Sequence, residues 1–127
     1  MPPPHVATVL IVEDDGTTRL VLRHIVAAAG CVAETAADGV EALEWLSSHS
    51  PPQLILLDLV LPRLGGEQML RRIARQPPLS RVPVVVLTGG AQGAAVATHP
   101  QVRAVLSKPF VPEQIRTIIQ ELTKDYG

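Results

Sequence analysis

Aromatic residues are scarce in this chain of 127 residues: they make up 2% of it, whereas hydrophobic residues of all kinds make up 46%. The core must therefore be built from Val, Leu, Ile and Ala, which is typical of helices layered on a parallel sheet. The chain also has a single cysteine, Cys31, which excludes an internal disulfide. Because Cys31 lies among apolar residues, we interpret it as a small buried hydrophobic side chain and not as a reactive thiol.

No long run of one charge sign occurs, and no long run of apolar residues. The chain has 11 basic and 12 acidic residues, which give a formal net charge of −1. Without a basic stripe or a polybasic run, direct binding to nucleic acid is not expected. No apolar run reaches membrane-spanning length, and residues 1–5 lack the charged and apolar regions of a signal peptide. We therefore expect a cytoplasmic protein without membrane contact, with one domain over 1–127 and a frayed leader at 1–6.

Four short apolar runs are each followed at once by a polar or charged residue. In chain order these residues are Glu13 and Asp14 after 9–12, Asp58 after 54–57, Thr88 after 84–87, and Lys108 at the end of the run 102–107. Runs this short and this continuously apolar predict strands buried on both faces of a parallel sheet. The carboxyl ends of such strands line the crevice in which ligands bind. Three carboxylates, a hydroxyl and an amine around one crevice suit a divalent metal ion and a phosphoryl group.

Segments with helical spacing separate these runs. Apolar residues recur at i, i+3, i+4 and i+7 in 22–29 and 115–122, and shorter stripes lie in 40–46 and 69–73. Asp38 and Pro112 are typical helix-start residues, and we expect Asp15 to be a helix cap and no more. The run 32–36 is a mixed strand that suits an edge position. A β-α order repeated five times predicts a three-layer sandwich with right-handed crossovers.

The segment 89–100 departs from this pattern. It should form the fourth helix, but it holds three glycines and four alanines, and Val96 is its only sizeable apolar side chain. Each interior glycine costs a helix about 1 kcal/mol. Without an apolar stripe, tertiary packing adds little stability. We predict a short or mobile helix there.

Five motifs, in order and each at a strand end or in the loop after it, resemble the response-regulator receiver family over about residues 7–124. They are Glu13-Asp14, Asp58, Pro62 with Gly66, Thr88, and Lys108-Pro109-Phe110. The resemblance implies an α/β flavodoxin-like (βα)5 fold, with a parallel sheet of strand order 2-1-3-4-5. It also implies a signalling module of a two-component or phosphorelay system that is not an enzyme. Its partners would be a sensor histidine kinase or a phosphotransfer protein, and a downstream protein that the sequence does not identify.

The resemblance also assigns roles to residues. Asp58 would accept the phosphoryl group from a phosphohistidine, and Thr88 and Lys108 would contact the phosphoryl oxygens. Asp14, Asp58 and the main-chain carbonyl of Val60 would bind Mg²⁺, with Glu13 holding it through water. The Lys108–Pro109 bond is usually cis in this family, and Val60 and Gly90 stand where access of the hydrolytic water is tuned.

The chain departs from the family at Val105, where receivers usually carry an aromatic residue that swings inward after the threonine moves. Since valine has no ring to swing, we hypothesise that phosphorylation orders or displaces the fourth helix instead. Val105 also leaves open an alternative, a pseudo-receiver adaptor that works without phosphate.

Two further alternatives are less well supported by the residues. An aspartyl phosphatase dependent on Mg²⁺ would carry a second aspartate where Val60 stands, and a flavin phosphate would be repelled by the acidic turn 13–15. Dimerisation of the phosphorylated state, the cognate kinase, and the choice between a standalone regulator and a domain of a hybrid kinase are left open by the sequence.

Overall fold

The computed structural model describes residues 6–90 and 92–126, so that nearly all of the expected leader at 1–6 lies outside the described residues. Its centre is a parallel five-stranded sheet of order β2-β1-β3-β4-β5, as predicted. The strands are β1 (Thr8–Val12), β2 (Val32–Ala36), β3 (Leu54–Asp58), β4 (Val84–Thr88) and β5 (Val102–Ser107). The helices are α1 (Gly16–Ala28), α2 (Gly39–Ser48), α3 (Gly66–Ile73), α4 (Gly93–Val96) and α5 (Pro112–Thr123), with a 3₁₀ turn η1 (Leu79–Arg81).

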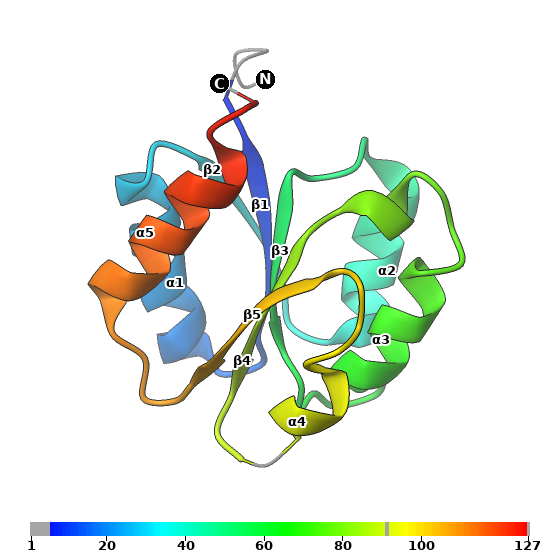
Figure 1. The fold of residues 1–127 in the computed structure, drawn as a ribbon. Coiled ribbons are helices and arrows are strands. Elements are labelled where there is room, and N and C mark those ends of the chain that lie inside the picture. The colour runs from blue at the N-terminus through cyan, green and yellow to red at the C-terminus, as the bar shows by residue number, and fades with distance from the viewer. Residues whose placement is uncertain (1–5, 91, 127) are drawn as a thin grey trace.

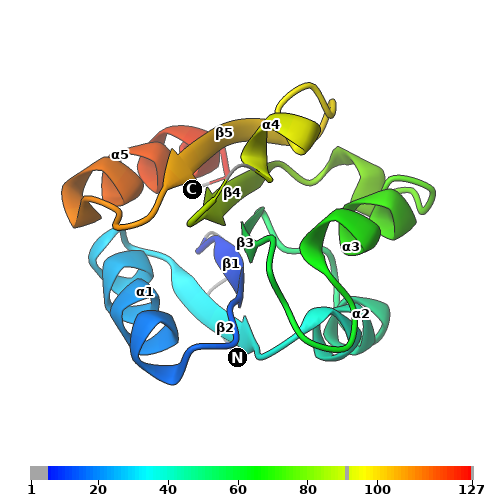
Figure 2. The same ribbon diagram turned by 90° about the horizontal axis from the view of Figure 1, so that it is seen from below.

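The sheet is the middle layer of three. Helices α1 and α5 cover one face, and α2 and α3 cover the other, with α4 on the same side as α3, next to β4 (Figures 1 and 2). Side chains alternate along each strand, so β1 sends Val9 and Ile11 into the α1–α5 core and Leu10 and Val12 into the α2–α3 core. Burial on both faces explains why the central strands are continuously apolar. The predicted three-layer sandwich is confirmed.

The strand β5 is the exception to the predicted burial. We expected every apolar run to be covered on both faces, but β5 is an edge strand in which Arg103 and Ser107 are exposed and only Leu106 is buried. An edge strand pairs with a neighbour on one side only. The helix α4, with four residues, is also too short to cover β5. The expectation is correct for β1, β3 and β4 and wrong for β5. The mixed strand β2 lies at the opposite edge, as predicted.

The helix starts follow the expected local chemistry. Asp15 and Asp38 are the N-caps of α1 and α2, and their carboxylates accept hydrogen bonds from Thr18 N and Glu41 N, both at 2.8 Å. Pro112 is the first residue of α5, where a missing N–H costs nothing. Within the described residues, no helix is long and apolar enough to cross a membrane.

The fourth helix is short, as the glycine-rich sequence predicts. It spans four residues, of which Gly93 and Val96 are buried. Its N-cap is Gln92, whose side chain forms no capping hydrogen bond. The predicted shortness of this helix is confirmed, and its mobility stays a prediction.

Candidate functional site

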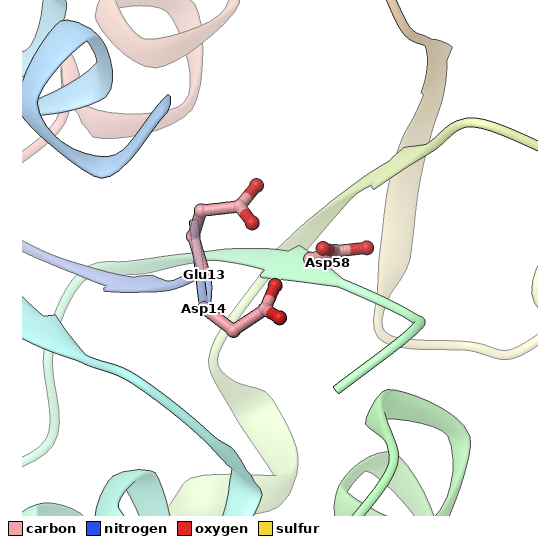
Figure 3. A group of neighbouring side chains, drawn as sticks. All are labelled: Glu13, Asp14 and Asp58. Carbon is pink, nitrogen blue, oxygen red and sulfur yellow. The ribbon is translucent and has the colours of Figure 1, made fainter. Parts of the chain in front are cut away.

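Three carboxylates gather at the carboxyl end of the sheet. Glu13 and Asp14 directly follow β1, and Asp58 is the last residue of the neighbouring strand β3. Figure 3 shows the three side chains directed toward a common space, and one carboxylate oxygen from each lies within 4.8 Å of the others. Glu13 and Asp58 are buried, whereas Asp14 is exposed at the mouth of the site. The three acids that the strand-end pattern predicts to meet therefore lie together in the structure.

The ammonium group of Lys108 enters this cluster from the end of β5. Its Nζ donates to Oε1 of Glu13 at 2.7 Å and to Oδ2 of Asp58 at 3.3 Å. Burial lowers the pKa of Lys108, but the hydrogen bond to Glu13 and the charge of Asp58 outweigh it, so the pKa lies above its usual value. The Lys108–Pro109 peptide bond is cis, as expected. The lysine is thus a permanent cation against two of the three acids.

Thr88 ends β4 beside this cluster, and its side chain is buried. Its hydroxyl oxygen accepts a hydrogen bond from Gly90 N at 3.3 Å, and its carbonyl accepts one from Lys108 N at 2.8 Å. The hydroxyl is therefore hydrogen-bonded to the loop after β4, and the main-chain carbonyl of Thr88 holds the main chain of Lys108 in place.

The loop after β3, residues 59–65, passes close to the acids. Val60 N donates to Oδ1 of Asp58 at 3.1 Å, and the Val60 side chain is exposed. At the end of the loop, a Cβ on Gly66 would lie 2.6 Å from the carbonyl oxygen of Asp58, so a glycine is needed there. We expected Pro62 and Gly66 to shape a loop, and for Gly66 the close approach to Asp58 gives the reason.

The site is an open cleft of about 420 Å³, and its lining includes Glu13, Asp14, Asp58, Val60, Gly90 and Lys108. Three carboxylates this close repel one another, and the single ammonium group offsets only part of that charge. A set of oxygen donors without sulfur or nitrogen ligands suits a hard cation such as Mg²⁺. The residues present therefore fit a magnesium ion beside the lysine.

One residue at this site was missed by the sequence analysis. Arg19 of α1 donates from Nη1 to the main-chain carbonyls of Glu13 at 2.9 Å and Asp14 at 3.3 Å, and so holds the acidic turn. No sequence signal distinguishes Arg19 from a surface arginine, because its partners are backbone atoms.

Comparisons with known proteins agree with this geometry. A family model described as the response regulator receiver domain matches residues 9–120. The receiver domain of a signal transduction histidine kinase from Syntrophus aciditrophicus has a TM-score of 0.85 and 27% identity, with 94% of this chain and 92% of that chain covered. A sensor histidine kinase receiver domain from Pseudomonas aeruginosa, described with a magnesium ion coordinated in its active site cleft, has a TM-score of 0.83 and 26% identity, with 94% and 98% covered.

One relative matches this chain over only part of the relative's own length. The DNA-binding transcriptional regulator NtrC of Escherichia coli is 31% identical over 120 residues, which are 93% of this chain and 25% of NtrC. The chain thus spans about a quarter of the length of this relative.

Proposed function

Because the chain belongs to the response regulator receiver domain family, we propose that Asp58 accepts a phosphoryl group from a phosphohistidine on a sensor histidine kinase or phosphotransfer protein. A carboxylate oxygen of Asp58 forms a bond to phosphorus while the bond from phosphorus to the histidine nitrogen breaks. The electron pair of that bond stays on the imidazole, and the product is an aspartyl phosphate. Attack of water on this acyl phosphate then restores Asp58 and releases inorganic phosphate. The observation that carries the proposal is the gathering of Glu13, Asp14 and Asp58 within 4.8 Å around one lysine.

The acids would hold Mg²⁺ directly through Asp14, Asp58 and the Val60 carbonyl, and Glu13 would hold it through water. When bound, the ion supplies positive charge next to the phosphoryl oxygens. Lys108 adds a second positive charge next to Asp58, and its contact with buried Glu13 keeps it oriented. Thr88 would donate its hydroxyl to a phosphoryl oxygen once it leaves Gly90. The protein thereby offsets the charge of the transferring group without forming a separate catalytic base.

A surface next to Lys108 suits the protein that carries the phosphohistidine. An apolar cleft of about 580 Å³ is lined by Val21, Lys108, Pro109, Phe110 and other residues of the α1 and β5–α5 region. Lys108 lines both this cleft and the acidic site, so a protein seated here brings its phosphohistidine to Asp58. Leu20 and Val21 of α1 are exposed large apolar residues, which is typical of interaction surfaces.

Output would pass through protein–protein contact, and the packing around α4 offers a route. A Cβ on Gly93 would lie 2.7 Å from Cγ1 of Val105 and 3.1 Å from Cγ2 of Thr88, so these three residues are in close contact. Movement of Thr88 toward a phosphoryl group would therefore disturb the seat of α4 without any aromatic ring. This extends the hypothesis that phosphorylation orders or displaces the fourth helix.

The direct test is the intact mass of the protein after incubation with Mg²⁺ and acetyl phosphate. We expect a gain of one phosphoryl group that EDTA abolishes and that is absent from Asp58→Asn. A folded wild-type protein that binds Mg²⁺ but gains no mass would refute the proposal and favour the phosphate-independent adaptor. Continuous turnover of a small phosphate ester would instead indicate the aspartyl phosphatase, although Val60 leaves that reaction without the second aspartate.

A further inference from the structure

An ion pair joins the loop after Asp58 to the start of α2. Arg63 donates from Nε to Oδ2 of Asp38 at 2.8 Å and from Nη2 to Oδ1 at 3.1 Å, so that both carboxylate oxygens are engaged by one guanidinium group. The Asp38 side chain is 10% exposed and also caps α2 through Glu41 N. The Arg63 side chain is 58% exposed. The pair therefore links a rigid, well-anchored acid to an arginine on a surface loop.

The backbone around this pair is closely constrained. Arg63 has a φ of +63°, in the left-handed region that residues with a Cβ rarely adopt. Next to Asp38, a Cβ on Gly39 would lie 2.3 Å from the carbonyl oxygen of Leu64. The top of the loop thus lies directly on the first turn of α2, and the ion pair holds Arg63 in an unfavourable conformation.

The two ends of the same loop lie on Asp58. At one end Val60 N donates to Oδ1 of Asp58, and at the other Gly66 N donates to Leu59 O at 3.0 Å, where a Cβ on Gly66 would lie 2.6 Å from the Asp58 carbonyl oxygen. Residues 59–65 therefore form an arch with both feet at Asp58 and its top on α2. Among the described residues, the side chain of Arg63 forms hydrogen bonds only with Asp38, the N-cap of α2.

We propose that the Asp38–Arg63 pair is a positioning device, which holds the arch so that the Val60 carbonyl and the Asp58 carboxylate are correctly placed for Mg²⁺. The inference rests on the proposed function, because it assigns a purpose to the arch at the metal site. Because the Arg63 side chain is 58% exposed, the ion pair contributes only modestly to folding stability. Groups that orient metal ligands, by contrast, typically change metal affinity by about 10- to 100-fold. The pair should therefore matter far more for the metal than for the fold.

The variants separate these two effects. Arg63→Gln removes the guanidinium group, and Asp38→Asn removes the charge but keeps a good N-cap for α2. Arg71→Gln is the matched control, because Arg71 forms an ion pair of the same length, 2.8 Å, with Glu67 on the exposed face of α3. Arg63→Lys retains the charge without the two-pronged geometry and should recover part of the effect.

The experiment is a Mg²⁺ titration of wild type and variants by isothermal calorimetry, alongside their melting temperatures. We expect affinity to fall by on the order of tenfold in Arg63→Gln and in Asp38→Asn. The double variant should lose no more than either single variant, since the two residues act as a unit. The melting temperature of Arg63→Gln should stay close to that of Arg71→Gln, whose Mg²⁺ affinity should equal that of wild type.

The outcomes distinguish this inference from the function on which it rests. Equal Mg²⁺ affinity in wild type and both single variants would overturn the positioning role while leaving phosphorylation of Asp58 intact. Additive losses in the double variant would also overturn it. A wild-type protein that binds no Mg²⁺ would overturn the metal site and the positioning role together. One that binds Mg²⁺ but is not phosphorylated would refute only the proposed function.

Discussion

The Nζ of Lys108 lies 2.7 Å from Oε1 of Glu13, a carboxylate that is 1% exposed. Its contact with the proposed phosphoacceptor Asp58 is longer, at 3.3 Å. The lysine is therefore held mainly by Glu13, and its hydrogen bond to Asp58 is the weaker of the two. Glu13 accordingly has two proposed tasks, since it orients the lysine and would hold Mg²⁺ through water. Replacing Lys108 tests how the lysine and Mg²⁺ share these acids.

Lys108→Gln should change metal binding and phosphorylation in opposite directions. Loss of the ammonium group leaves three acids with no cation among them, so Mg²⁺ should bind more tightly. Phosphorylation by acetyl phosphate should slow by on the order of 10²-fold, the usual effect of removing one charge-stabilising group. Calorimetry measures the first effect and the time course of intact mass measures the second.

The matched control is Lys124→Gln, because Lys124 also forms a 2.7 Å ion pair, with Glu121 on α5. This control should leave both quantities unchanged. If Lys108→Gln weakened Mg²⁺ binding, the lysine would be supporting the metal site structurally. The idea that the Lys108 ammonium group and Mg²⁺ compete for the same acids would then be wrong.

The pH dependence of stability should reveal the charge of Asp38. Its hydrogen bonds from Arg63 and from Glu41 N lower its pKa below the usual value. A carboxyl group with a lowered folded-state pKa adds stability above its unfolded pKa, and this contribution is lost as the pH falls through the folded value. The difference in unfolding free energy between wild type and Asp38→Asn should thus be constant near neutral pH and shrink below about pH 4.

Urea denaturation from pH 3 to pH 7 measures that difference. In an Arg63→Gln background the loss should be smaller and should be complete at a higher pH, because the strongest cause of the lowered pKa is gone. A curve that does not respond to Arg63→Gln would show that the cap, and not the ion pair, determines the charge of Asp38.

Two glycines in equivalent positions should tolerate alanine very differently. Gly16 and Gly39 each follow an aspartate N-cap, at the first residue of α1 and α2. A Cβ on Gly39 would lie 2.3 Å from the carbonyl of Leu64, whereas the nearest atom to a Cβ on Gly16 is the flexible end of Arg19 at 3.8 Å. Gly39→Ala should therefore cost about 1–3 kcal/mol of unfolding free energy, and Gly16→Ala should be neutral or stabilising. Equal effects in urea denaturation would contradict the packing of the arch on α2.

The sequence was most informative where a function depends on local order along the chain. Asp58 and Lys108 could be placed because each ends an apolar run, and parallel strands bring such ends together. It was least informative where the partner is remote. Asp38 and Arg63 are ordinary charged residues that only the return of the loop onto α2 brings together. The exposure of β5 was missed for a different reason, because the run 102–107 contains the charged residue Arg103, which itself indicates an uncovered face.

The contact of Gly93 with Val105 predicts how the state of Asp58 reaches α4. If Thr88 moves toward a phosphoryl group, its methyl group leaves the tight contact with Gly93, and α4 loses part of its seat. Hydrogen exchange over residues 92–105 should therefore change when beryllofluoride and Mg²⁺ occupy the site, while exchange in α5 should not. Val105→Ala removes the Cγ atoms that pack against Gly93. Hydrogen exchange of α4 in this variant should therefore already differ from wild type in the free protein. It should also respond less to beryllofluoride. If wild type and Val105→Ala responded equally, the signal would have to leave the site by another route, because Val105 is the β5 side chain that touches Gly93. In that case β5 would take no part in the output, and the absence of an aromatic residue at position 105 would have no consequence for signalling.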